Sequence, residues 1–176
     1  MRLFRRPTRD AAGYEVHFEH PTQPLAAAFL KAAADERHED VWSALSKESR
    51  GLLEGRYASR LGLRLAHASG VGDAADDARV AEIAGPIAAS IVATLGGAEA
   101  VNATAVSAAR LLARGEVFVL LLPRFERENT FVREEDWKPG HVLGFVYEDR
   151  EWRVDIGLTA TLSEDAELPD PLGGIA

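Results

Sequence analysis

The stretch Tyr147–Ile156, YEDREWRVDI, decides the fold because it contains two strands that meet at a tight turn. The first strand ends at Tyr147, and Glu148–Arg150 reverse the chain. The second strand then places Trp152, Val154 and Ile156 on one face, which is the period-two pattern of a half-buried strand. This hairpin predicts that the C-terminal half of the chain is an antiparallel meander.

The meander extends back to Val117–Leu122, a strand that is apolar on both faces. A strand of this kind is covered on both sides. We expect helices over one face, and either the ends of the chain or a second subunit over the other. A long charged connection, Arg124–Pro139, leads to the next strand, His141–Tyr147, and Glu151–Leu158 is the last strand. Long loops are more often functional than short ones.

The N-terminal half predicts helices, because apolar residues recur every three or four positions. The expected elements are a short strand over Tyr14–Phe18, helices over Leu25–Ala33, Val41–Leu45, Arg50–Ala68 and Val80–Leu95, and an ambiguous segment over Val101–Leu112. Pro86 is expected to kink or split the fourth helix, because proline removes a backbone donor. The alanines of the ambiguous segment favour a helix, whereas its alternation also fits a strand.

The length of 176 residues fits a single α+β domain with N-terminal helices packed on a curved, mostly antiparallel C-terminal sheet. Residues 1–13 form a basic arm, either for an acidic partner or as a frayed terminus, and we favour the second alternative. Residues 14–162 form the folded core. The acidic segment 163–176, with its prolines and glycines, is predicted to be a flexible tail.

The composition excludes several classes of function. The net charge of −8 argues against nucleic acid as a partner, and the absence of cysteine excludes disulfides and thiolate zinc sites. The apolar runs are shorter than the roughly 20 residues of a membrane span. The N-terminal arginines are not followed by the apolar region of a signal peptide, so we expect a cytoplasmic protein.

Two segments together resemble the nuclear transport factor 2-like superfamily, which includes ketosteroid isomerases and the SnoaL-like polyketide cyclases. The first comprises Ala26–Ala32 and Asp40–Arg50, a helix followed by acids and a short helix that ends at Ser46-x-x-Ser49. The second is Val146–Asp155, which is similar to the last hairpin of many members. The turn and strand Arg114–Val119 stand where the sheet of the family begins.

The resemblance implies a cone-shaped fold, in which a curled sheet surrounds helices and leaves a cavity at its open end. It also implies a homodimer that packs through the convex face of the sheet. The helical region Arg50–Leu95 is longer than the single helix usual in the family. An extra helix there would cap or fill the cavity.

Acid–base residues are present singly, and their spacing does not bring them together. His141, Tyr147 and Asp155 are the candidates for catalysis. Asp155 is either a pocket carboxylate or part of a surface ion pair with Arg153 and Glu151, and we favour the ion pair. His141 lies on the same strand face as Leu143, Phe145 and Tyr147. On an apolar face a histidine is more often a structural residue than an acid–base group.

Two other sets of residues are candidates for binding. The aromatic residues Trp42, Tyr57 and Phe145 either line a ligand pocket or belong to the core, which is the usual place for the first two. The stripe of Arg56, Arg60 and Arg64 would suit an anionic ligand. More often such a stripe is solvated or paired, here with the acids that follow it, which are Asp73, Asp76 and Asp77.

Metal binding has no support in the sequence, since His17-x-x-His20 is the closest approach to ligand spacing and two ligands are too few. No cofactor motif is present. The sequence therefore predicts a non-catalytic domain that binds a small apolar ligand or a protein partner. The alternative is a small-molecule isomerase, cyclase or dehydratase. An enzyme would need at least two of its acid–base side chains to converge.

Overall fold

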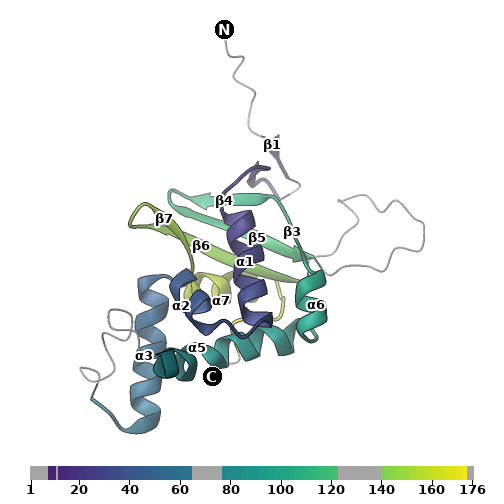
Figure 1. Ribbon diagram of the computed structural model, residues 1–176. Helices are drawn as coiled ribbons and strands as arrows, with labels where there is room; N and C mark the ends of the chain where they lie inside the picture. Colours follow the sequence, from purple (N-terminus) through teal and green to yellow (C-terminus); the bar gives the residue numbers. More distant parts are fainter. Residues whose placement is uncertain (1–7, 11, 65–76, 123–139, 174–176) are drawn as a thin grey trace.

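The computed structural model of the chain describes residues 8–10, 12–64, 77–122 and 140–173 (Figure 1). It is an α+β protein whose described strands form one seven-stranded antiparallel sheet. Its helices are α1 (Thr22–Ala34), α2 (His38–Ala44), α3 (Lys47–Leu61), α5 (Asp77–Thr94), α6 (Ala98–Ala103) and α7 (Ile156–Asp165). Its strands are β1 (Thr8–Arg9), β2 (Glu15–His17), β3 (Ala105–Val106), β4 (Ala109–Ala113), β5 (Glu116–Leu122), β6 (His141–Glu148) and β7 (Glu151–Val154). The predicted fold class is confirmed.

The strand order is β1-β2-β4-β5-β6-β7, and β3 also pairs with β5. The predicted meander forms the centre and one edge of this sheet. The hairpin between β6 and β7 turns through Asp149 and Arg150, both of which have positive φ (48° and 68°). Two left-handed residues are the signature of a type I′ turn, whose twist matches that of the flanking strands.

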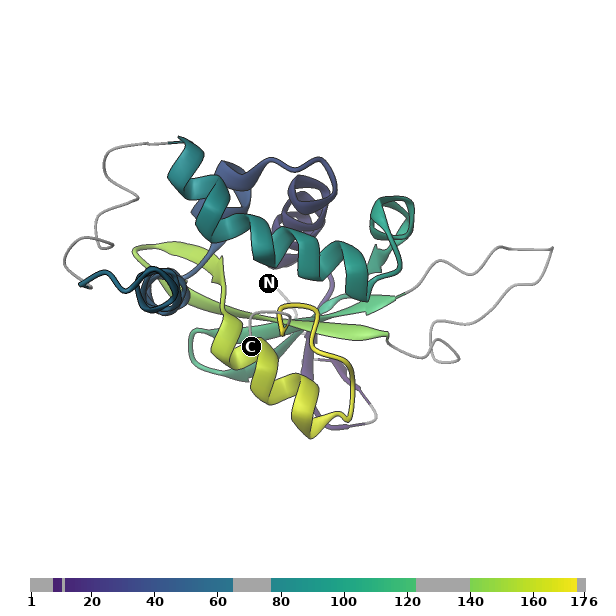
Figure 2. The same ribbon diagram turned by 90° about the horizontal axis from the view of Figure 1, so that it is seen from below.

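The helices lie on both faces of the sheet, but unequally. Figure 2 shows α1, α2, α5 and α6 on one side of the sheet and α7 alone on the other. The first side holds the main core, where Phe29, Ile87 and Ile91 pack with the odd-numbered side chains of β5 and with Phe145 of β6. Helix α7 packs on β6, so the end of the same chain covers part of the second face of the sheet. For Val117–Leu122, the expected alternatives were coverage by the ends of the chain or by a second subunit, and the first is observed over part of the sheet.

Several boundaries differ from the prediction. Ile156 begins α7 instead of continuing the last strand, because Asp155 caps a helix there. Helix α5 continues through Pro86 without splitting into two elements. The ambiguous segment contains both predicted states, since α6 ends at Ala103 and β3 and β4 follow.

Both ends of the described chain are attached to the fold. Ser163–Asp165 complete α7, and Leu172 is 1% exposed within the main core, which corrects the predicted flexible tail for residues 163–173. At the other end, Asp10 Oδ2 accepts a hydrogen bond of 2.7 Å from Arg110 Nε of β4. The charged connection 124–139 lies outside the described residues.

Candidate functional site

The three predicted acid–base residues do not form a site. His141 and Tyr147 lie near the two ends of β6, six residues apart in an extended strand, which corresponds to about 20 Å. His141 Nδ1 donates a hydrogen bond of 2.9 Å to the carbonyl oxygen of Pro169 and so holds the C-terminal segment. The separation of His141 and Tyr147 exceeds the reach of shared acid–base catalysis.

Asp155 is neither a pocket carboxylate nor a member of a surface ion pair, so both predictions for it are wrong. Its side chain is 7% exposed and caps α7 by accepting a hydrogen bond of 2.8 Å from the backbone N–H of Leu158. Its other oxygen accepts hydrogen bonds from the hydroxyls of Ser46 (2.6 Å) and Ser49 (3.2 Å). Every oxygen of this carboxylate therefore has a partner within the fold, and its role is structural.

The predicted pocket aromatics are core residues. Phe145 is fully buried beneath the helices, and Trp42 belongs to the same cluster, with Tyr57 packed at its margin. Tyr57 Oη donates a hydrogen bond of 2.5 Å to Glu82 on α5, and this bond raises the pKa of Tyr57. These contacts fix α3 against α5, and they correct the prediction of a ligand pocket formed by these three side chains.

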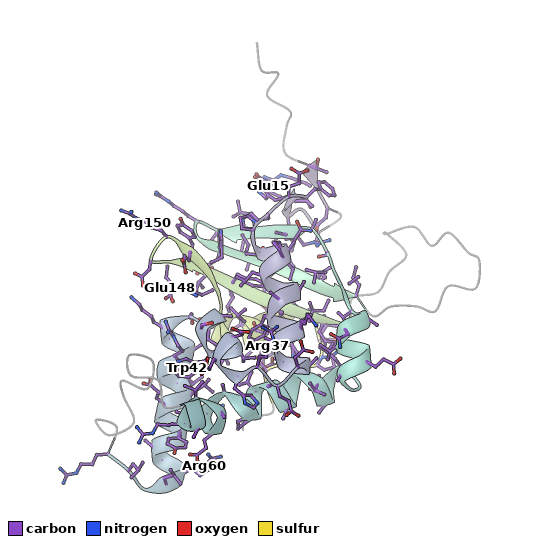
Figure 3. The ribbon with its side chains drawn as sticks, viewed as in Figure 1. Glu15, Arg37, Trp42, Arg60, Glu148 and Arg150 are labelled. Carbon is purple, nitrogen blue, oxygen red and sulfur yellow. The ribbon has the colours of Figure 1, made fainter. Side chains whose placement is uncertain are left out.

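The arginine stripe starts on α3, the helix that carries Tyr57. Figure 3 shows Arg60 at the end of α3 that is remote from the sheet. Its guanidinium carbon stands 5.6 Å from the centre of the Tyr57 ring, a cation–π contact. Arg56 and Arg64 are exposed on the same helix and just beyond its end. The side chains of the three acids predicted to pair with the stripe lie outside the described part of the chain.

A group of aromatic and imidazole rings gathers instead at one end of the helix-covered face, and it draws on three separate segments. We call His17, His20, Tyr147 and Trp152 the aromatic–histidine cluster. The ring of His20 packs edge-on against Trp152 with centroids 4.9 Å apart, and Trp152 contacts Tyr147 at 5.1 Å. The His17 and His20 rings are 5.9 Å apart.

The cluster joins residues that are far apart in the strand order of the sheet. His17 ends β2 and His20 precedes α1, whereas Trp152 lies on β7, beyond β4, β5 and β6 in the strand order. Neighbouring strands are about 4.8 Å apart, so a contact between His20 and Trp152 requires a curved sheet and a chain that passes over its face. In Figure 3, Glu15 of β2 and Glu148 of the β6–β7 hairpin lie on opposite sides of the start of α1.

Local contacts fix the protonation of His20. Its Nδ1 accepts from the backbone N–H of Thr22 at 3.4 Å and lies 2.9 Å from the Thr22 hydroxyl. A backbone N–H can only donate, so the proton of the neutral ring is on Nε2. Burial lowers the pKa of His20, and the neighbouring His17 lowers it further. The ring is therefore neutral at pH 7 and has an N–H donor.

The cluster is partly open to solvent. The Tyr147 side chain is 51% exposed, and His17, His20 and Trp152 are half-buried. Glu15 Oε1 is 3.2 Å from His17 Nε2, within ion-pair distance, although His17 Nε2 has no hydrogen-bond partner in the described structure. Open aromatic rings beside a fixed donor are suited to binding, because aromatic groups contribute large contact area and an oriented polar edge.

Sequence reasoning missed this cluster because it assigned its parts separately. Tyr147 was grouped with His141 and Asp155, Trp152 was placed on a core face, and His17 and His20 were compared only with metal ligands. No group of three or more metal-ligating side chains occurs among the described residues. The available signal was the run His17–His20 shortly before a helix, together with an aromatic residue on each strand of the last hairpin, Tyr147 and Trp152.

Comparison of the chain with protein-family models, with curated proteins and with solved structures gives no significant match. Within the described residues, no helix is both long and apolar enough to span a membrane. Function must therefore be argued from the site itself.

Proposed function

We propose that this chain is a non-catalytic ligand-binding domain of the nuclear transport factor 2-like type, and that it acts in the cytoplasm. Its ligand is a small, mainly apolar molecule that binds to the aromatic–histidine cluster. The observation that carries the proposal is the contact of His20 with Trp152, which leaves the Tyr147 ring exposed beside them. Most of the helices pack on one face of the antiparallel sheet, with aromatic rings at the end of that face, and this arrangement supports the proposal.

Two features support binding over catalysis. The candidate acid–base residues are separated along β6 or are consumed by structural hydrogen bonds. Beside the cluster, Glu15 lies within ion-pair distance of His17, but a single carboxylate–imidazole pair without a nucleophile is not a catalytic set. A homodimer stays a prediction, since α7 already covers part of the sheet face that a partner would use.

Titration with indole, a flat apolar probe, tests this proposal. We expect indole to shift the backbone and side-chain NMR signals of the cluster in a saturable manner. The Trp152 side-chain signal is assigned by its loss in Trp152→Phe. Tyr147→Ala should weaken indole binding about threefold to tenfold, the range expected for loss of one aromatic contact.

Leu61→Ala is the matched control, because Leu61 on α3 is also 51% exposed and lies outside the cluster. This variant should bind indole as the wild type does. Shifts that do not saturate, or that map to α3 or α5 instead of the cluster, would refute the proposed site.

A further inference from the structure

His20 gives the proposed site a polar selectivity that aromatic rings alone would not give. Its Nδ1 is occupied by the two groups of Thr22, which leaves Nε2 as the free edge of the ring. Within the described residues, Nε2 has no hydrogen-bond partner. Because Nε2 carries the proton, the His20 ring beside Trp152 can donate a hydrogen bond to an acceptor on a ligand.

Two acceptors near His20 in the chain already have other partners. Glu15 Oε1 lies 3.2 Å from His17 Nε2, and Gln23 Oε1 accepts a hydrogen bond of 3.1 Å from the His20 backbone N–H. Pro21 separates His20 from Thr22, the first residue of α1, and the Thr22 N–H at this helix end meets Nδ1 and not Nε2.

The geometry points to a flat ligand that carries a hydrogen-bond acceptor at its edge, and the carboxylate of an aromatic acid is the class that fits best. The ring would lie against Trp152 and Tyr147, and one carboxylate oxygen would accept from His20 Nε2–H. This inference rests on the proposed function, because it names the ligand class of the same site. A hydrogen bond to a charged acceptor is stronger than one between neutral groups.

Three probes with the same ring separate the possibilities, namely indole, indole-3-acetate and tryptamine. At pH 7.5 we expect indole-3-acetate to bind about tenfold more tightly than indole, which corresponds to one charge-assisted hydrogen bond. Tryptamine, whose ammonium group can only donate, should bind more weakly than indole. The measurement is the dissociation constant of each probe, from the shift of the Trp152 side-chain signal.

Two variants at position 20 show whether the donor is responsible. His20→Phe keeps an aromatic ring but removes the donor, so the preference for indole-3-acetate should disappear while indole still binds. His20→Gln restores an N–H donor at a similar reach and should recover part of the preference. His38→Gln, at a histidine on α2 outside the cluster, should leave all three constants unchanged.

The outcomes distinguish this inference from the proposed function. Equal binding of indole and indole-3-acetate, or a preference that survives in His20→Phe, would overturn the ligand class while the site itself stands. Failure of all three probes to bind would overturn both. If His20→Phe loses the dispersed spectrum of a folded protein, the comparison of wild type with His20→Gln decides the question.

Discussion

Ser46 and Asp155 share a hydrogen bond of 2.6 Å although 109 residues separate them in the chain. Each residue is the N-cap of a helix, Ser46 for α3 and Asp155 for α7, so one carboxylate serves two helix N-termini. The backbone joins the same junction, since Ser46 N donates to the carbonyl oxygen of Val154 on β7. A negative charge is favourable at each of the two helix ends.

Asp155→Ala is expected to lower the free energy of unfolding by about 3 kcal/mol. Loss of the α7 cap contributes about 1 kcal/mol, and the buried hydroxyls of Ser46 and Ser49 lose their acceptor at about 1 kcal/mol or more each. Urea titration measures the change. Asp165→Ala, at the exposed end of the same helix, should change stability by less than about 0.5 kcal/mol. Similar losses of stability in both variants would contradict a stabilising role for the hydrogen bonds of Asp155.

Ser163→Ala is expected to stabilise the protein by about 1 kcal/mol. Ser163 is 1% exposed on α7, and its hydroxyl has no hydrogen-bond partner among the described residues. Alanine removes the unsatisfied hydroxyl and is the better helix former. Denaturant midpoints at unchanged slope provide the measurement.

Thr159 provides the opposite case one turn earlier on α7. Its hydroxyl accepts from Gly144 N at 3.0 Å and donates to Asp155 O at 2.7 Å. Thr159→Ala should therefore lower stability by about 2 kcal/mol, because a buried backbone N–H loses its acceptor. A loss of stability in Ser163→Ala as large as that in Thr159→Ala would contradict the hydrogen-bonding argument.

Gly144→Ala is expected to destabilise the protein by about 2 kcal/mol through a clash between β6 and α7. A Cβ at this position would lie 2.7 Å from Leu158 Cγ and 3.0 Å from its Cδ2. In a Leu158→Ala background both atoms are gone, so the cost of Gly144→Ala should fall by more than half. Equal costs in the two backgrounds would show that Leu158 is not the obstacle.

Gly51→Ala is the matched control, because a Cβ on Gly51 of α3 would meet no atom within 4 Å. Alanine is a better helix former than glycine, by up to about 1 kcal/mol at an exposed position. This variant should be as stable as the wild type or more stable. The same added methyl group thus has opposite effects at two sites.

The sequence predicted what depends on local pattern. Val117–Leu122 was recognised as a strand covered on both faces, and it forms most of β5. A helix was expected to begin at Arg50, after Ser46-x-x-Ser49, and α3 begins three residues earlier, at Lys47, with Ser46 as its N-cap. These features follow from the periodicity and capping chemistry of adjacent residues, so a single sequence contains them.

The sequence did not predict what depends on distant partners. Asp155 continues an alternating pattern, whereas in the structure β7 ends at Val154 and the Asp155 carboxylate meets the distant Ser46. The cluster of His20 and Trp152 likewise requires the curvature of the sheet, which no local spacing encodes. The acidic composition of the C-terminal segment led to the prediction of a flexible tail. In the structure Leu172 packs in the core, while the acids of that segment are mostly exposed.

Asp170 makes stability depend on pH in a direction that is unusual for a carboxylate. Burial raises the pKa of Asp170 above its ordinary value of 3.8, although the N–H of Leu172 donates to its Oδ1 at 2.8 Å. The folded chain therefore binds this proton more tightly than the unfolded chain does. Its contribution is most favourable below pH 3.8 and declines as the pH rises through the raised pKa.

Asp170→Asn keeps an oxygen for Leu172 N and removes the buried charge, so it should be more stable than the wild type at pH 7. The difference should shrink as the pH falls through the raised pKa, because the wild-type carboxyl is then protonated in the folded state and, below pH 3.8, mostly protonated in the unfolded state as well. Urea titrations of both proteins from pH 3.5 to pH 7 measure this. Asp165→Asn at the exposed end of α7 is the control for surface charge. If Asp170→Asn is less stable at pH 7, the attraction between Asp170 and His141 outweighs the cost of burial, and Asp170 anchors the C-terminal segment by charge.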